Sequence, residues 1–432
     1  MKALGVALAF GAGLALAVPS GAADAPLVIR GARVVTVSGP VIEKGTVVVE
    51  GGRIVAVGAD VAVPGGATVV DGTGKTLYPG LLDALTTIGL TEIAAVPATI
   101  DTTEVGDLNP QVHAWVALHP DSEMIPVARA AGVTAVLTAP AGGLVSGQSA
   151  VVRLAGTTPS SMVVKAPAAL HAVFPSGQPP AEASRSSEEP EPKTLAQRLE
   201  EQKKNKKKAL DRLASLLAEA KAHVAAEADA SRPAPETTLA LDALAAFAGG
   251  QAPVVMRADR EDDIRAAVRF AKDNGLRLVI AGGLEAWRCA DLLKQGDVAV
   301  LLKVLRLPER DSDPYDAAYA NAAVLHRAGV RFAIVSDDPE NVRNLPVEAA
   351  MAAAYGLGEE EALRAITLSP AEIFGVADRL GSIAPGREAN LVLATGDILD
   401  ARTRVTDVFV EGVPQPIDTR HTRLYDRYKD RP

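Results

Sequence analysis

Charged side chains stand where several apolar, strand-like segments of the sequence end. The set comprises Asp337 and Asp338 after RFAIV, Arg257, Asp259 and Arg260 around the end of PVVM, and Lys165 at the end of MVVK. A carboxylate such as Asp337 can act as a general base toward water, and Lys165 or Arg257 can stabilise an oxyanion. An arginine that faces an aspartate can also bind a zwitterionic or carboxylate ligand. These residues therefore indicate a small-molecule site, with Asp337 and Lys165 as catalytic candidates and Arg257, Asp259 and Asp338 as binding candidates.

The histidines do not form a recognisable metal motif. None of the six has the HxH or HxxxH spacing that brings two imidazoles to one cation, so a binuclear zinc site built from them is not expected. His113 and His171 follow strand-like sequence and could approach the same site, whereas His223 and His326 fall in helical segments and are expected to be structural or exposed. The one cysteine, Cys289, excludes an intrachain disulfide and a cysteine-based metal cluster.

Composition bounds the class of protein and its partners. The chain has 432 residues, 48% of them hydrophobic and 22% charged, which is ordinary for a globular protein with a large core. A net charge of -9 argues against nucleic acid or an anionic membrane as the main partner. We expect a small-molecule ligand, and association with a second copy or with a related chain stays open.

The N-terminal sequence predicts export. Lys2 precedes an uncharged apolar run to Pro19, and small residues follow at 20–23, which is typical of a signal peptide that is cleaved near Ala22 or Ala23. The alternative is an uncleaved anchor, for which the run is short. We expect residues 1–23 to be removed and the mature protein to be periplasmic or secreted, without a stable membrane anchor.

The segment from Pro26 to Thr76 predicts a small β module. Runs of β-branched residues alternate with glycine turns, and Gly51-Gly52 and Gly72-Thr73-Gly74 read as hairpin turns. Strand-like sequence returns near the C-terminus. Because the two β segments flank the rest of the chain, we expect residues 24–78 and 380–420 to form one composite β-sandwich domain.

Between these segments, residues 79–379 predict a (β/α)8 barrel of the TIM type. Four apolar strands between Pro253 and Val335 are each separated by one helix, which requires parallel pairing. The helix after PVVM begins with acidic residues and ends at Gly275, a glycine placed as a C-terminal cap. A doubly wound open sheet fits the same pattern.

An insertion, residues 176–235, interrupts the barrel. Its first part is rich in Pro, Ser and Glu and is expected to be loosely packed. Its second part is helical, since Leu210, Leu213, Leu217, Ala220 and Val224 follow a three–four spacing. The basic run at 203–208 suits either anion binding or, as we favour, a solvated helix start.

Three blocks of sequence, in order and at fitting distances, resemble the amidohydrolase superfamily, particularly its imidazolonepropionase-like branch. They are GRIVAVG with ATVVDGTGKTLYPGLLDA, then FAIVSDDP, and then EEALRAITLSPAEIFGVADRLGSIAPGREANLVL. The resemblance covers nearly the whole mature chain. It implies a barrel with a composite β-sandwich, and metal-assisted hydrolysis of non-peptide C–N bonds in cyclic amides or peptide-like small molecules.

The resemblance also implies a set of metal ligands at the C-terminal ends of the barrel strands. The family usually has a His-x-His pair on strand one, a Lys or Glu on strand four, a His on each of strands five and six, and an Asp on strand eight. Only Asp337 matches this set fully. Leu85 and Thr87 replace the strand-one pair, and Arg257 replaces the strand-five histidine. Lys165 falls where a carboxylated lysine would sit.

The sequence thus leaves two functions open. One is an exported C–N hydrolase that acts without a metal or with a single weakly bound zinc or other divalent cation. The other is a non-catalytic member of the superfamily that binds a ligand or pairs with an active relative. In either function Arg257 and Asp337 could bind the ligand or fill the metal space as a salt bridge.

Overall fold

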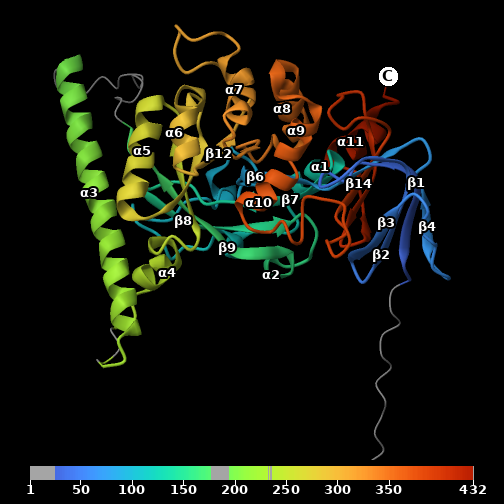
Figure 1. The fold of residues 1–432 in the computed structure, drawn as a ribbon, viewed down its shortest axis with the longest axis horizontal. Helices are drawn as coiled ribbons and strands as arrows, with labels where there is room; N and C mark the ends of the chain where they lie inside the picture. The colour runs from blue at the N-terminus through green and yellow to red at the C-terminus, as the bar shows by residue number, and fades with distance from the viewer. Residues whose placement is uncertain (1–24, 177–193, 232, 234–235, 432) are drawn as a thin grey trace, which may run out of the picture.

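A computed structural model describes residues 25–176, 194–231, 233 and 236–431, and these residues form two eight-stranded sheets with helices packed around the second. Figure 1 shows the first sheet at one end of the molecule and a long helix at the other. The predicted export signal and the first part of the insertion, residues 177–193, lie outside the described residues. No helix within the described ranges is long and apolar enough to span a membrane.

The first sheet joins both ends of the chain. Its N-terminal strands are β1 (Leu27–Val34), β2 (Ile42–Glu50), β3 (Arg53–Gly58), β4 (Thr68–Asp71) and β5 (Thr76–Pro79), and its C-terminal strands are β14 (Leu391–Ala394), β15 (Val405–Val410) and β16 (Val413–Gln415). Strand β14 pairs antiparallel with β5, which links the two groups. Glycine suits the β2–β3 turn because Gly51 and Gly52 both have positive φ. The hairpin predicted at 72–74 is wrong, because β4 and β5 both pair with β1 in the parallel sense.

The second sheet is the barrel. In chain order its strands are β6 (Leu81–Thr86), β7 (Val133–Thr138), β8 (Val145–Arg153), β9 (Val163–Val173), β10 (Pro253–Ala258), β11 (Arg277–Gly282), β12 (Ala299–Leu302) and β13 (Phe332–Ile334), and each pairs with the next. The predicted fold class, a TIM-like barrel with a β-rich second domain, is confirmed, and the four strands expected between Pro253 and Val335 are parallel. The strands are nearly all buried, as a sheet covered on both faces requires.

One strand departs from the expected all-parallel barrel. Strand β8 runs antiparallel to both β7 and β9. Every residue of β8 is buried, including the polar Ser146, Gln148 and Ser149, and burial on both faces gives no information about the direction of a strand. The consequence is that the C-terminal end of β8, at Arg153, lies at the opposite end of the barrel from the C-terminal ends of the other strands.

A backbone hydrogen bond and the buried side chain of Asp83 link the last strand of the barrel to its first. Asp337 donates its backbone N–H to the carbonyl of Leu85 at 3.1 Å. The Asp83 side chain of β6 is completely buried and accepts hydrogen bonds from both the backbone amide and the hydroxyl of Ser336. Burial raises the pKa of Asp83 to about 7, although its hydrogen bonds act in the opposite direction.

Helices follow the strands and cover the barrel. They include α5 (Glu261–Asn274), α6 (Ala290–Gln295) preceded by a 3-10 turn at Ala286–Cys289, and α7 (Ala317–Arg327), and α5 ends at Gly275 in the left-handed conformation, as predicted. Other helices are α1 (Met124–Ala130), α2 (Pro159–Met162), α8 (Leu345–Ala352), α9 (Glu359–Ala365), α10 (Leu368–Ile373) and α11 (Arg420–Tyr428). Further short 3-10 turns are Pro97–Thr99, Ala114–Ala117 and Val342–Asn344, and a π-helical turn is Ala353–Leu357.

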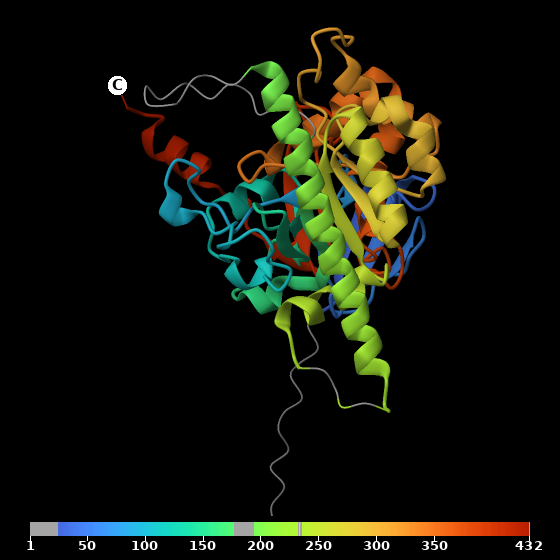
Figure 2. The same ribbon diagram turned by 90° about the vertical axis from the view of Figure 1, so that its left-hand side faces the viewer.

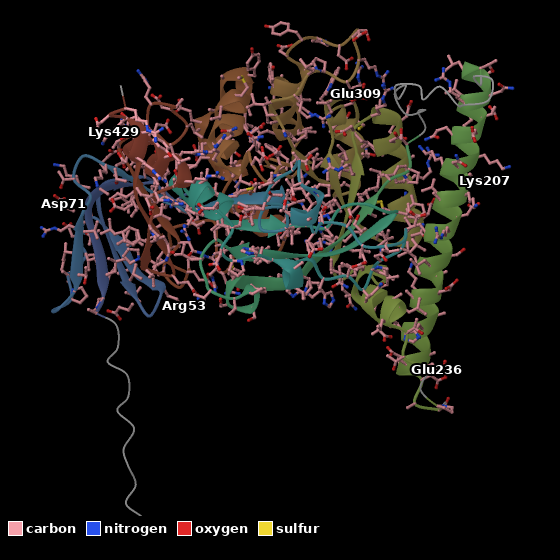
Figure 3. All side chains as sticks on the ribbon, turned by 180° about the vertical axis from the view of Figure 1, so that it is seen from behind. Arg53, Asp71, Lys207, Glu236, Glu309 and Lys429 are labelled. Atoms are coloured by element: carbon pink, nitrogen blue, oxygen red, sulfur yellow. The ribbon has the colours of Figure 1, made fainter. Side chains whose placement is uncertain are left out.

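The helical part of the insertion is a single long helix, α3 (Leu195–Ala228), which runs along the side of the barrel (Figure 2). Leu213, Leu217 and Ala220 are buried as the spacing predicted, but the next buried position is His223, whereas Val224 is exposed. The basic side chain of Lys207 points away from the barrel (Figure 3). A shorter helix, α4 (Leu239–Ala248), packs against α3 and is joined to β8 by a hydrogen bond from Gln148 to the Ala243 carbonyl.

Candidate ligand site at the barrel mouth

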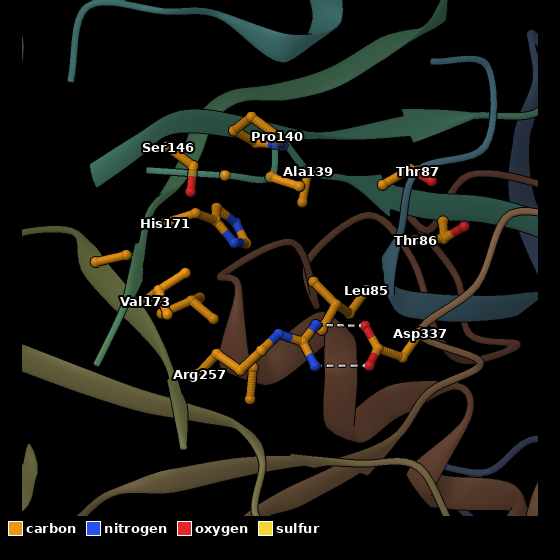
Figure 4. A pocket seen from close by; sticks show the side chains of 15 residues that line it. Leu85, Thr86, Thr87, Ala139, Pro140, Ser146, His171, Val173, Arg257 and Asp337 are labelled. Atoms are coloured by element: carbon orange, nitrogen blue, oxygen red, sulfur yellow. Dashed lines mark hydrogen bonds and ion pairs between the residues drawn. The ribbon is translucent and has the colours of Figure 1, made fainter. Parts of the chain in front are cut away.

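The barrel mouth, where the parallel strands have their C-terminal ends, contains a bidentate ion pair. The guanidinium of Arg257, near the end of β10, donates to both carboxylate oxygens of Asp337 just after β13, with Nη1–Oδ2 and Nη2–Oδ1 distances of 2.8 and 2.6 Å. Figure 4 shows the two groups facing each other across the barrel. Hydrogen bonding to Asp337 raises the pKa of Arg257, despite partial burial that acts in the opposite direction. The sequence predicted each residue at a strand end, and the structure brings the two together.

The backbone of Asp337 is adapted to this position. Its φ is +51°, a conformation that aspartate adopts more readily than most residues other than glycine. The side chain is 18% exposed, compared with 41% for Arg257. The carboxylate is therefore held by the barrel wall, while part of the arginine faces open space.

A cavity of about 300 Å³ opens beside the ion pair. Its wall is mostly apolar, and Leu85 and Thr87, the residues at the positions of the resembled His-x-His pair, line it next to Asp337. The other lining residues that Figure 4 labels, apart from the ion pair, are Thr86, Ala139, Pro140, Ser146, His171 and Val173. The site is thus an apolar pocket with charged groups on one side, which is typical of small-molecule sites.

His171 lies in the wall of this cavity, near the end of β9. Its ring is buried, and its Nε2 atom is 2.8 Å from the hydroxyl oxygen of Ser149. Burial and the nearby Arg257 charge lower the pKa of His171 to about 3, so the imidazole is neutral above that pH. The expectation that His171 could approach the mouth is met. Its neutral ring can contribute shape and a hydrogen bond to a ligand but no charge.

Asp259 belongs to a second ion pair of the mouth. Its carboxylate accepts from Arg306 at 3.4 Å and lies against Gly282, where a Cβ atom would come within 2.5 Å of a carboxylate oxygen. Burial raises the pKa of Asp259, while Arg306 and Arg257 act in the opposite direction. Since β11 ends at Gly282, the absence of a side chain there leaves the space that Asp259 occupies.

The segment after β12, residues 303–316, is attached to the mouth by charges that the sequence patterns did not reveal. Arg260 donates to Glu309 at 2.7 Å, and Arg310 donates at 2.9 Å to Glu285, which is completely buried. Arg306 supplies a third pair, with Asp259. Figure 3 shows Glu309 on this projecting segment. The two residues of each of these ion pairs are 25 to 49 positions apart in the sequence, so no local pattern could have predicted the pairs.

Asp338 has a structural role in this conformation. One carboxylate oxygen accepts the backbone N–H groups of Glu340 and Asn341, at 2.7 and 2.9 Å. Its carbonyl accepts from Thr86 and Ser336. Its side chain does not appear among the residues that line the cavity, so the structure does not bring it together with Arg257 and Asp337 as a binding residue.

Lys165 is far from the mouth, which corrects the prediction that it stands at the end of its strand. Strand β9 continues to Val173, and it is Val173 that pairs with Arg257. Lys165 precedes Val173 by eight residues, roughly 25 Å along an extended strand. Its Nζ donates to the carbonyl of Phe374 at 2.8 Å, at the opposite end of the barrel. Lys165 therefore cannot act together with Asp337 on one ligand.

That opposite end has an ion cluster of its own, which we call the floor cluster: Arg153, Arg379 and Glu388. Glu388 is 3% exposed and accepts from Arg379 at 2.6 Å and from Arg153 at 3.4 Å. The cluster joins the end of β8 to the segment that leads into β14. None of its three residues lines the cavity of the mouth.

Within the described residues, one group of three side chains has the composition and proximity of a metal site, and it is not at the mouth. It consists of His223, Glu227 and Asp242, whose ligand atoms lie within 4.8 Å of one another. These residues belong to α3 and α4, at the side of the barrel.

Comparison with known proteins supports the resemblance. A model of the amidohydrolase family matches residues 316–415. The amidohydrolase tasK of Hapsidospora irregularis is 30% identical over 105 residues, which are 24% of this chain and 11% of that protein. The matched segment thus spans about a tenth of that curated relative.

Solved structures match over a much larger part of the chain. The crystal structure of an amidohydrolase from Thermotoga maritima MSB8 is 28% identical, with a TM-score of 0.77, and the match covers 90% of this chain and 99% of that one. A prolidase complexed with N-methylphosphonate-L-proline is 18% identical, with a TM-score of 0.53 over 90% and 99% of the two chains. The second likeness shows the fold alone.

Proposed function

We propose that the barrel mouth of this chain, a member of the amidohydrolase superfamily, binds a small carboxylate-bearing molecule through Arg257. The ligand would lie in the space where relatives of the resembled branch hold a metal. On the three sequence blocks, we propose the imidazolonepropionase-like branch for the chain. The observation that carries the proposal is the bidentate Arg257–Asp337 pair on the wall of the cavity.

The residues of the mouth do not fit a divalent cation. Leucine offers no lone pair at position 85, and threonine at position 87 is a weak neutral ligand. Both carboxylate oxygens of Asp337 already accept from a guanidinium, which has no lone pair to donate and would repel a cation. His171 alone could donate an imidazole nitrogen, and one ligand does not make a site.

The same groups suit an anionic ligand. A guanidinium has five N–H donors, and Asp337 uses two of those of Arg257, so three remain for a ligand. The side chain is 41% exposed and borders the cavity. Leu85, Val173 and Val255 offer an apolar surface for the body of the ligand, and the Ser146 hydroxyl faces His171 across the same space (Figure 4). A compact molecule with one carboxylate and a short apolar group meets these requirements.

Calorimetric titration with N-acetyl amino acids and their neutral amides tests this function. Carboxylates should bind at least about tenfold more tightly than the matched amides, because only they accept from Arg257 in a charge-assisted way. R257M should abolish the difference, and R364M, which changes an arginine paired with Glu372 away from the mouth, should retain it. Equal binding of acids and amides, or no binding by any member, would contradict the proposal.

The second candidate function is hydrolysis of a C–N bond, the activity that membership of the superfamily implies. It is supported by the position of the Asp337 carboxylate beside the cavity, where it could accept a proton from water if the ligand drew Arg257 away. Lys165 has no part in it. Release of product from cyclic amides and dipeptides by the purified chain, absent in D337N, would establish this activity.

We also propose that the chain is exported, on the N-terminal sequence. Mass spectrometry of the protein from its native cell should find a chain that begins near residue 23 or 24. A chain that retains Met1 or Lys2 in the cytoplasm would contradict this.

A further inference from the structure

Two helices at the side of the barrel bring an imidazole and two carboxylates together. His223 on α3 is 6% exposed, and its Nε2 atom is 2.6 Å from an oxygen of Asp242 on α4. Glu227, one helical turn further along α3, has a carboxylate oxygen 3.6 Å from the same nitrogen. All three ligand atoms lie within 4.8 Å of one another.

The helices place these groups without distortion. Side chains four residues apart lie on one face of a helix, so Glu227 follows His223 by geometry alone. His223 continues the buried face of α3 made by Leu213, Leu217 and Ala220. The buried residues Leu244 and Phe247 and the bond from Gln148 fix α4, and with it Asp242. The three donors therefore come from two elements that are already packed.

If the Nε2 atom of His223 carries one proton, only one of the two carboxylates can accept a hydrogen bond from it. A neutral imidazole can donate from Nε2 to one carboxylate, and at 2.6 Å that partner is Asp242. Glu227 is then left 3.6 Å from the nitrogen, close to a second negative group. A divalent cation in place of the proton would accept the lone pair of Nε2 and an oxygen from each acid, and it would neutralise both charges.

We propose that His223, Glu227 and Asp242 form a divalent transition-metal site that ties the end of α3 to α4. One nitrogen and two carboxylate oxygens are a ligand set that zinc accepts. Glu227 is 52% exposed, so water can complete the coordination from the solvent side. The site is distinct from the barrel mouth and does not depend on the function proposed there.

Zinc titration of the chelator-washed full-length protein tests the site. Wild type should bind one equivalent, H223Q should bind none at this site, and E227Q should bind at least about tenfold more weakly, because even partners outside the ligand shell are worth about that much. The matched control is E219Q, which changes an exposed glutamate on the same helix. Zinc should also raise the melting temperature of wild type and E219Q but not that of H223Q.

The variant D337N separates this site from the mouth. It should bind zinc as wild type does. The proposal is overturned if wild type binds no zinc, if E227Q and E219Q bind it equally, or if D337N loses the binding while H223Q retains it. Circular dichroism of H223Q checks that α3 remains folded. If it does not, E227Q, whose side chain is half exposed, decides the outcome alone.

Discussion

Each end of the barrel has a carboxylate that accepts hydrogen bonds from arginine, but the two ends differ in the hydrogen-bond donors that remain for a ligand. In the floor cluster, Glu388 is 3% exposed and serves both Arg153 and Arg379. At the mouth, Asp337 serves one guanidinium, which is 41% exposed and borders a cavity. The near-complete burial of Glu388 and Arg153 gives the first arrangement a structural role, whereas the partly exposed Arg257, with N–H donors that Asp337 does not use, makes the second a candidate binding site.

The comparison explains why charge alone does not identify a site. Lys165 and Arg257 both stand in barrel strands, yet Lys165 donates to backbone carbonyls at the floor and Arg257 donates into the mouth. The difference lies in the end of the strand that each occupies. In parallel barrels the C-terminal ends carry function and the N-terminal ends carry stability.

The largest expected effect is on the floor cluster. Replacement of Glu388 by alanine removes the buried partner of both arginines and leaves Arg153 only the partly exposed Glu411, at 3.1 Å, which should lower the free energy of unfolding by about 3 kcal/mol. A shift of the urea midpoint measures this effect. The matched control is E372A, which removes a half-exposed partner of Arg364 and should change stability by at most about 1 kcal/mol. Equal losses in the two variants would break the comparison.

The next effect is on ligand affinity at the mouth. R257K keeps the charge but loses the planar fork that matches a carboxylate. Binding of N-acetyl-L-leucine should weaken by about tenfold or more, while the urea midpoint moves less than in E388A. If R257K destabilised the chain as much as E388A and left binding unchanged, the Arg257–Asp337 pair would have a structural role like that of the floor cluster.

A smaller effect concerns the pH dependence of stability. Asp83 has a folded-state pKa of about 7, above the value of 3.8 for the free group, so the folded chain holds its proton more tightly than the unfolded chain. The stability that this provides is fully present below about pH 4 and is lost as the pH rises through 7. The melting temperature should therefore fall by on the order of a few degrees between pH 5 and pH 8.

In D83N this fall should be reduced, because asparagine does not titrate. The control is D378N, since Asp378 lies near the floor and outside the Asp83–Ser336 bond. A variant D83N whose melting temperature follows pH as that of wild type does would show that another group is responsible.

Much of the fold could be predicted from the sequence because its signals are local. The helix Glu261–Asn274 has acids in its first turn and a left-handed Gly275 at its end, and both features were readable from residue types alone. The direction of β8 was not readable. All of its residues are buried although several are polar, and a strand is buried equally whichever way it runs.

The site was predictable only in part, for a related reason. Asp337 and Arg257 could be placed at strand ends, but their bidentate contact joins residues 80 positions apart and depends on barrel closure. His171 was recognised only as able to approach the mouth, since its strand was predicted to end near Lys165. Glu285, which lies buried beneath Arg310, gave no signal because nothing local distinguishes it from an exposed helix-start acid.

At the mouth, we propose that Arg257, and not a metal, holds the ligand. The most direct test is the affinity of wild-type protein for N-acetyl-L-leucine measured by calorimetry, once in excess EDTA and once with added zinc. We expect the same affinity in both, since the carboxylate meets a guanidinium in either case. Binding that disappears in EDTA and returns with zinc would contradict it.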